Sequence, residues 1–256
     1  MKPEYPGFAP RSSRRSVLKG TVAGVTGLAA VAGVVGAGTF LAQRDEGGAA
    51  HAQFVGAAGA EPVQTILNVA ITAEQLAVTF YTQALAHADR IGFGEAARLD
   101  IAAALVEEQI HEQFLAKQKA KALTSKFSFP FGRQTFERLD TFIKVQQQLE
   151  TLFVAAYIAA AREFAVLKRP DLVQIAMQIG TVEAEHRALG RAIGGLRPAD
   201  NHAFSPALVK NVGDAAAILK KDGYLTPKLG NMFEFKPVST TFNGMVARSE
   251  VEQTWS

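Results

Sequence analysis

Four long stretches of the chain repeat apolar residues every three to four positions, over residues 62–89, 95–123, 135–168 and 170–194. This spacing places the apolar side chains along one face of an α-helix. In the first stretch that face carries Ile66, Ala70, Ala77 and Leu85. The pattern predicts an all-α fold in which four helices bury these faces in one bundle.

The ends of these stretches carry helix signals. Pro62 and Pro170 suit the first position of a helix, where the missing N–H of proline costs nothing. Thr135 is expected to cap the third helix, and the glycines of 194–195 to end the fourth. Beyond residue 197 the periodicity weakens. There we expect a short helix over 212–219 and an extended tail whose phenylalanines pack on another surface.

Residues 124–134 separate the second and third helices. Pro130 and Gly132 break the helical pattern here, and 11 extended residues reach roughly 36 Å, about the length of a 24-residue helix. Such a crossover lets the second and third helices run in the same direction. The alternation of Phe127, Phe129 and Phe131 favours a loop held by its aromatic rings, with a short strand as the alternative.

Acidic and histidine side chains interrupt the apolar faces at repeated positions. Glu74 and Tyr81 recur 76 residues later as Glu150 and Tyr157, and the pair Glu108 and His111 recurs 75 residues later as Glu183 and His186. Residues three apart on a helix lie on the same face, so each Glu-x-x-His pair can bind one metal ion. The chain therefore reads as two copies of one helical hairpin, each with a glutamate on its first helix and Glu-x-x-His on its second.

A carboxylate among apolar neighbours must be protonated, paired or bound to metal. Two hairpins of this kind bring four carboxylates and two imidazoles into the middle of a bundle, the ligand set of di-iron and di-manganese proteins. Oxygen and imidazole ligands without sulfur suit Fe or Mn better than Cu(I) or a structural zinc site. A chance coincidence of acids and histidines in a plain bundle is the alternative, which the matched spacing of the two copies disfavours.

Over roughly residues 60–225 the chain resembles the bacterial exported ferritin-like proteins, a family that includes desiccation-related proteins of the plant type. The resemblance rests on Glu74, Glu108-x-x-His111, Glu150 and Glu183-x-x-His186. It implies a ferritin-like four-helix bundle holding two Fe or Mn ions per chain. It further implies that Glu108 and Glu183 bridge the ions, that Glu74 and Glu150 each cap one, and that His111 and His186 each bind one.

Tyr81 and Tyr157 are candidate catalytic residues, because they lie two turns from the capping glutamates on the same faces. Their hydroxyls could hydrogen-bond the glutamates or donate electrons, but packing in the core is the favoured role. Gly180 and Gly190 lie one turn from Glu183 and His186, where a small residue leaves room for a metal, water or a backbone approach.

Composition removes several classes of function. The chain has no cysteine, which excludes disulfides, thiolate metal sites and cysteine nucleophiles. Its net charge of +3 is carried entirely by the first 52 residues, so the remainder has no excess charge and no nucleic-acid partner is expected.

The N-terminal segment has the pattern of an export signal. Arg14 and Arg15 precede a mildly apolar, glycine-rich run over residues 20–42, and Ala50-His51-Ala52 offers a small-residue cleavage site. We expect the twin-arginine translocation machinery as a partner and a periplasmic, cell-surface or secreted location. The alternative is an uncleaved membrane anchor. The predicted division is an export signal over 1–52, a bundle over 53–196 and a C-terminal extension over 197–256.

The sequence favours two hypotheses about function, one an enzyme and the other a non-enzymatic protein. The first is a di-metal oxidoreductase, either a ferroxidase or an enzyme that consumes peroxide. The second is a protein of stress protection or structure in which metal chiefly stabilises the bundle. Storage in a hollow cage is a weaker third interpretation, and a homo-oligomer stays open.

Overall fold

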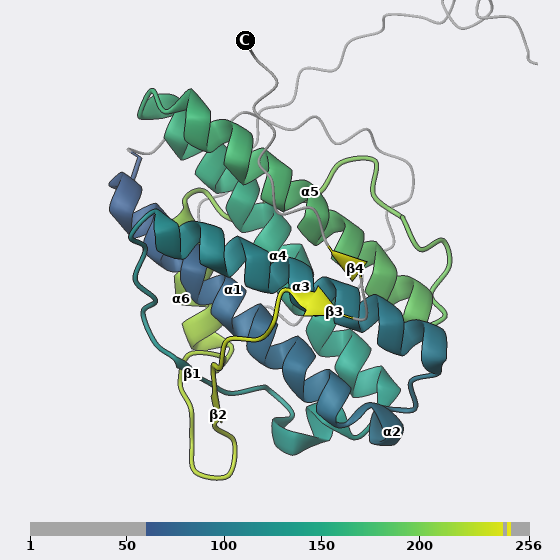
Figure 1. The fold of residues 1–256 in the computed structure, drawn as a ribbon. Coiled ribbons are helices and arrows are strands. Elements are labelled where there is room, and N and C mark those ends of the chain that lie inside the picture. The colour runs from purple at the N-terminus through teal and green to yellow at the C-terminus, as the bar shows by residue number, and fades with distance from the viewer. Residues whose placement is uncertain (1–59, 243–244, 247–256) are drawn as a thin grey trace, which may run out of the picture. The chain divides into compact units, whose positions relative to one another are not determined.

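A computed structural model of the chain describes residues 60–242 and 245–246, all within one compact unit. Four long helices form a bundle (Figure 1), and the apolar side chains that they bury form its core. The all-α prediction is confirmed. The helices are α1 (Val63–Ala86), α2 (Ala88–Ile91), α3 (Glu95–Lys117), α4 (Leu139–Val166), α5 (Pro170–Ile193) and α6 (Val212–Lys221).

The four long helices are arranged as two antiparallel hairpins, α1 with α3 and α4 with α5. Between the hairpins, Tyr81 of α1 contacts Glu150 of α4, and Tyr157 of α4 contacts Glu74 of α1. The later residue of one helix thus meets the earlier residue of the other, so α1 and α4 are antiparallel. Because α3 is antiparallel to α1, it runs in the same direction as α4. The predicted crossover topology is therefore confirmed.

The crossover follows the bundle from the end of α3 to the start of α4 (Figure 1). It is mostly a loop, as predicted, with one two-residue strand, β1 (Lys126–Phe127), paired antiparallel with β2 (Phe233–Glu234). Phe129 is buried against the ring of Phe80, with their centroids 5.6 Å apart. A 3₁₀ helix, η1 (Gly132–Phe136), then leads into α4. Aromatic packing thus holds the crossover against the bundle.

Several predicted boundaries need correction. Thr135 lies inside η1 and does not cap the third helix, because the chain is extended at Arg138 and α4 begins one residue later. The second helix ends at Lys117 rather than near residue 123, since Lys119 adopts a left-handed conformation with φ of 61°. The first helix is interrupted at His87, between α1 and α2. Pro170 begins α5 as predicted.

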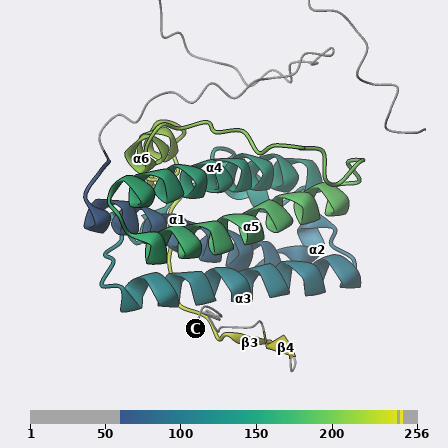
Figure 2. The ribbon, with the colours of Figure 1, turned by 90° about the horizontal axis from the view of Figure 1, so that it is seen from above.

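The described part of the C-terminal extension packs on the bundle. Helix α6 begins with a capping box between Asn211 and Asp214 and packs against α1 and α4. The chain then crosses to the opposite side of the bundle, where β3 (Thr241–Phe242) lies beside α3 and pairs with β4 (Met245–Val246) (Figure 2). On the way, the backbone N–H of Val238 donates to Gln109 of α3 at 2.8 Å.

The predicted export signal and its apolar run over 20–42 lie outside the described residues. Within the described part of the chain, no helix combines the length and apolar character needed to cross a membrane.

Candidate metal centre

The side chains predicted as metal ligands meet in the middle of the bundle. They form two overlapping groups, and the candidate ligand atoms of each group lie within 4.8 Å of one another. Glu108 and Glu183 belong to both groups. This sharing is the arrangement that two bridging carboxylates require. The groups are Glu74, Glu108, His111 and Glu183 on one side and Glu108, Glu150, Glu183 and His186 on the other.

The polar atoms at the middle of this cluster are buried without hydrogen-bond partners among the described residues. They include both carboxylate oxygens of Glu108 and of Glu183, one oxygen each of Glu74 and Glu150, and Nδ1 of both histidines. A buried polar group without a partner costs about 1–3 kcal/mol, and charged groups cost more. Among these six side chains, the buried atoms without partners all belong to the two candidate ligand groups, so a cation among them would satisfy the whole set.

Both histidines turn Nδ1 toward the carboxylates. His111 Nδ1 lies 3.4 Å from Glu74 Oε2 and 3.6 Å from oxygens of Glu108 and Glu183. His186 Nδ1 lies 2.9 Å from Glu108 Oε1 and 3.6 Å from Glu183 Oε2. None of these contacts combines the distance and the alignment of a hydrogen bond. Nδ1 is therefore the nitrogen that each histidine can offer to a metal.

The outer nitrogen of His186 has a carboxylate partner. Its Nε2 lies 2.8 Å from Oε2 of Glu107, whose side chain is 37% exposed. A carboxylate on the outer nitrogen fixes the tautomer of an imidazole and makes its inner nitrogen a stronger ligand. Glu107 flanks a ligand pair in the sequence, but its contact across the bundle with α5 is visible only in the fold.

The two tyrosines donate hydrogen bonds to Glu150 and Glu74, each of which belongs to the opposite hairpin. Tyr81 donates from its hydroxyl to Glu150 Oε1, and Tyr157 donates to Glu74 Oε1. Each glutamate keeps its second oxygen unpartnered and facing the cluster. Both rings are also buried in the core, so packing and hydrogen bonding occur together.

The electrostatics of the cluster follow from burial and from the crowding of acids. Burial, with the negative charges of Glu183 and Glu108, raises the pKa of Glu74 well above its usual range, and the same causes raise that of Glu150. Burial alone would raise the pKa of Glu108 too, but the charge of His186 and contacts with both histidines hold it below its usual range.

The histidines shift in the opposite sense to that expected from burial. Burial disfavours their charged forms, yet the surrounding carboxylates outweigh it and raise the pKa of His111 and of His186 well above the usual range. Protons on Glu74, Glu150 and the histidines therefore balance the charge of the metal-free cluster. Metal ions entering the cluster would displace these protons.

The two glycines near the cluster make room for side chains rather than for metal. A Cβ on Gly190 would lie 2.0 Å from Oε1 of Gln146, and one on Gly180 would lie 3.0 Å from Cβ of Tyr157. The sequence predicted that these glycines leave room for a metal, for water or for a backbone approach. In the structure, side chains of α4 take up this room.

Gln146 was not singled out by its sequence pattern. It is fully buried and donates to the backbone oxygen of His186 at 2.7 Å and to the hydroxyl of Tyr81 at 3.3 Å. Glu112 likewise is buried and accepts from Gln75 and Gln109. The signal for Gln146 was weak, because a glutamine on a helix face is common and Gly190 lies 44 residues away.

The residues fit a pair of divalent ions. Four carboxylates match the charge of two such ions, and the oxygen and imidazole donors suit Fe or Mn.

A family model for the ferritin-like domain matches residues 63–195. This chain belongs to the ferritin-like domain family. Searches of curated proteins and of solved structures found no match. The ferritin-like match covers all four long helices, and so includes every residue of the cluster.

Proposed function

We propose that this ferritin-like protein is an exported di-metal oxidoreductase that holds two Fe or Mn ions per chain. It oxidises Fe(II) with dioxygen or peroxide, or disproportionates peroxide when it carries manganese. The observation that carries the proposal is the pair of four-residue groups that share Glu108 and Glu183, with their inward atoms unpartnered.

Each side chain has a defined task in this proposal. Glu108 and Glu183, which belong to both groups, would hold both ions, while Glu74 with His111 and Glu150 with His186 would complete the two positions. A pair of Fe or Mn ions held by these residues would supply two-electron redox chemistry toward dioxygen or peroxide. Two electrons and two protons convert dioxygen to hydrogen peroxide, or hydrogen peroxide to two waters, while two Fe(II) ions become Fe(III).

The tyrosines keep the capping carboxylates in place. Because Tyr157 holds Oε1 of Glu74, the free Oε2 is directed at the cluster, and Tyr81 does the same for Glu150. Burial and the neighbouring carboxylates raise the pKa of both tyrosines well above the usual range. They therefore remain protonated hydrogen-bond donors at neutral pH.

A second function is favoured by one feature of the same cluster. Its ligands come from all four long helices, so bound ions would cross-link the bundle. In a protein of stress protection, metal would serve this stabilisation without turnover. The two functions differ in whether Fe(II) or peroxide is consumed catalytically.

Export by the twin-arginine machinery to the periplasm, the cell surface or the medium belongs to the same proposal. It is supported by Arg14, Arg15 and the apolar run that follows them. This route carries folded proteins, so the metal would be loaded before export.

The test begins with elemental analysis of the full chain, before and after addition of Fe(II) in air, together with an absorbance scan. About two Fe or Mn per chain are expected. The variants Glu108→Ala and Glu183→Ala should lose them, while Glu185→Ala, an exposed glutamate on the same helix as Glu183, should retain them.

Turnover is then measured as Fe(II) oxidation and as peroxide consumption. Metal bound without either activity would favour the protective function. Correctly folded protein that takes up no metal would rule out the enzyme.

A further inference from the structure

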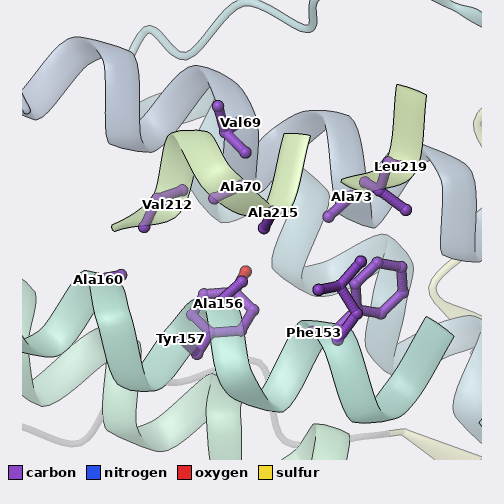
Figure 3. Close-up of a pocket in the computed structure, with 11 residues that line it drawn as sticks. Val69, Ala70, Ala73, Phe153, Ala156, Tyr157, Ala160, Val212, Ala215 and Leu219 are labelled. Carbon is purple, nitrogen blue, oxygen red and sulfur yellow. The ribbon is translucent and has the colours of Figure 1, made fainter. Parts of the chain in front are cut away.

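A small apolar cavity lies between α1, α4 and α6 (Figure 3). The cavity has a volume of about 20 Å³ for the centre of a bound molecule, which is enough for one small molecule. Nine of its lining residues are buried and no polar atom faces it. Water would find no hydrogen-bond partner on these walls, so the pocket favours an apolar occupant. Helix α6 contributes Val212, Ala215 and Leu219. Helices α1 and α4 contribute two alanines each, together with Val69 from α1 and Leu152, Phe153 and Tyr157 from α4.

The internal repeat shows that small residues at these positions are not required by the fold of the hairpins. In the 76-residue repeat, Ala73 corresponds to Leu149 and Ala156 to Phe80. Leu149 and Phe80 are both buried, and Phe80 packs face to face on Phe142 with centroids 4.9 Å apart. One end of the α1–α4 contact thus carries large side chains, and the cavity lies where the other end carries alanines.

One side chain joins the cavity to the metal centre. Tyr157 lines the cavity, as Figure 3 shows, and its hydroxyl donates to Glu74. Ala73, which also lines the cavity, directly precedes Glu74 in α1. A molecule in the cavity would therefore be one side chain away from a candidate metal ligand.

We propose that this cavity, between Ala73, Ala156, Tyr157 and Leu219, is a binding site for dioxygen that supplies the metal centre. Dioxygen is small and apolar, so it enters a cavity with wholly apolar walls more readily than peroxide or water does. The supply role rests on the proposed function, because it requires a centre that consumes dioxygen. Binding itself does not depend on that function.

Binding is tested by methyl NMR of the full chain under dioxygen pressure, in the metal-free form and with diamagnetic zinc. Dioxygen is paramagnetic and accelerates the relaxation of nearby methyl groups. We expect enhancement several-fold larger at Val69, Ala73 and Val212 than at Ile101 and Leu115, which are also buried but do not line the cavity. Equal enhancement at both sets would overturn the proposal and leave the alanines only a role in the close approach of α6.

Supply is tested by filling the cavity with the side chain that the repeat places at the corresponding position. Ala73→Leu should abolish the local relaxation enhancement and raise the KM for dioxygen in Fe(II) oxidation several-fold. With hydrogen peroxide as the oxidant, its rate should equal that of the wild type. Ala116→Leu, which adds the same side chain on the exposed face of α3, should change neither.

If Ala73→Leu folds poorly, Ala156→Val fills part of the cavity and takes its place. An unchanged KM for dioxygen in a variant that has lost the NMR signal would contradict the supply role. Wild-type protein that binds metal but never oxidises Fe(II) would contradict the proposed function, whereas the methyl relaxation would still decide whether the cavity binds dioxygen.

Discussion

Tyr81 of the first hairpin donates its hydroxyl hydrogen to Glu150 of the second, and Tyr157 returns the same contact to Glu74. Each tyrosine lies two turns from a glutamate on its own helix, yet it binds the glutamate of the other hairpin. The exchange links α1 to α4 through two buried hydrogen bonds. It also leaves one oxygen of each glutamate free beside the histidines. The contacts that hold the hairpins together therefore also orient the candidate ligands.

Removing either hydroxyl should weaken both the bundle and the metal centre. Tyr81→Phe leaves Glu150 Oε1 without its donor, and an unsatisfied buried group costs about 1–3 kcal/mol. The free energy of unfolding of the metal-free protein should fall by that amount, measured in urea, and metal affinity should fall too. Tyr224→Phe removes another buried tyrosine hydroxyl, which donates to Gln148 away from the cluster. It should leave metal affinity unchanged, and equal affinities in the two variants would contradict the orienting role.

Glu107 should tune the metal position that contains His186. Glu107→Gln removes the carboxylate from the outer nitrogen of the imidazole, and changes of this kind cost about 10–100-fold in metal affinity. Competition titration with a chelator measures the change. Glu185→Gln serves as the matched control, because its side chain is exposed on α5. A Glu107→Gln variant with wild-type affinity would show that the contact does not act on the metal.

The metal-free protein should lose stability as the pH rises above neutrality. Burial and the nearby carboxylates raise the pKa of Glu74 and Glu150, and the carboxylates raise that of both histidines. Groups with raised pKa values stabilise the fold fully below their unfolded values, 4.5 for Glu and 6.5 for His. This contribution disappears as the pH rises through the folded values.

The lowered pKa of Glu108 contributes stability above pH 4.5, the unfolded value. This contribution is lost as the pH falls below that value, so acid destabilises the fold. Urea unfolding in chelator between pH 5.5 and 8.5 should show this loss, and the Glu74→Gln and Glu150→Gln variants should show less of it. A stability that rises over this range would contradict the charge assignment.

Added metal should reverse that pH dependence. Metal displaces the protons of the cluster, so its affinity and the stabilisation it gives should both grow with pH. At 100 times the dissociation constant, one bound ion stabilises the fold by about 2.7 kcal/mol. A melting curve measured with and without Fe(II) or Mn(II) at pH 7.5 should shift markedly. An unchanged melting temperature would count against a buried metal site.

Glu163 should matter for the fold without touching the metal. Its buried carboxylate accepts from the backbone N–H groups of Glu61 and Val212, both at 2.8 Å, and so ties the start of α6 to α4. Glu163→Gln keeps one acceptor oxygen and places an amide against the other N–H. We expect about 1–3 kcal/mol of destabilisation by urea unfolding. Metal stoichiometry should stay at the wild-type value, and a loss of metal would show that α6 supports the centre directly.

The composition of the cluster was predictable because it depends on local geometry. Glu108 and His111 lie three residues apart, and helical periodicity alone places them on one face. The repeat of this pair as Glu183 and His186 doubled the signal. Pro170 marked the start of α5 for a similarly local reason, since proline fixes its own φ. Thr135 failed as a helix cap because it lies inside η1, where the neighbouring Phe136 packs on Phe80 of α1, a long-range contact.

The amino-acid sequence by itself determined which residues face the core and which of them carry side chains of the metal-ligating type, because helical periodicity is a property of the chain alone. Only the tertiary structure decided which residues meet across the helices. The partners of Tyr81, the contact of Glu107 with His186 and the fit of Gln146 against Gly190 all depend on how far each helix is shifted along its neighbour. That shift is set by side-chain packing over the whole core, and so is the cavity that α6 closes over the alanines of α1 and α4.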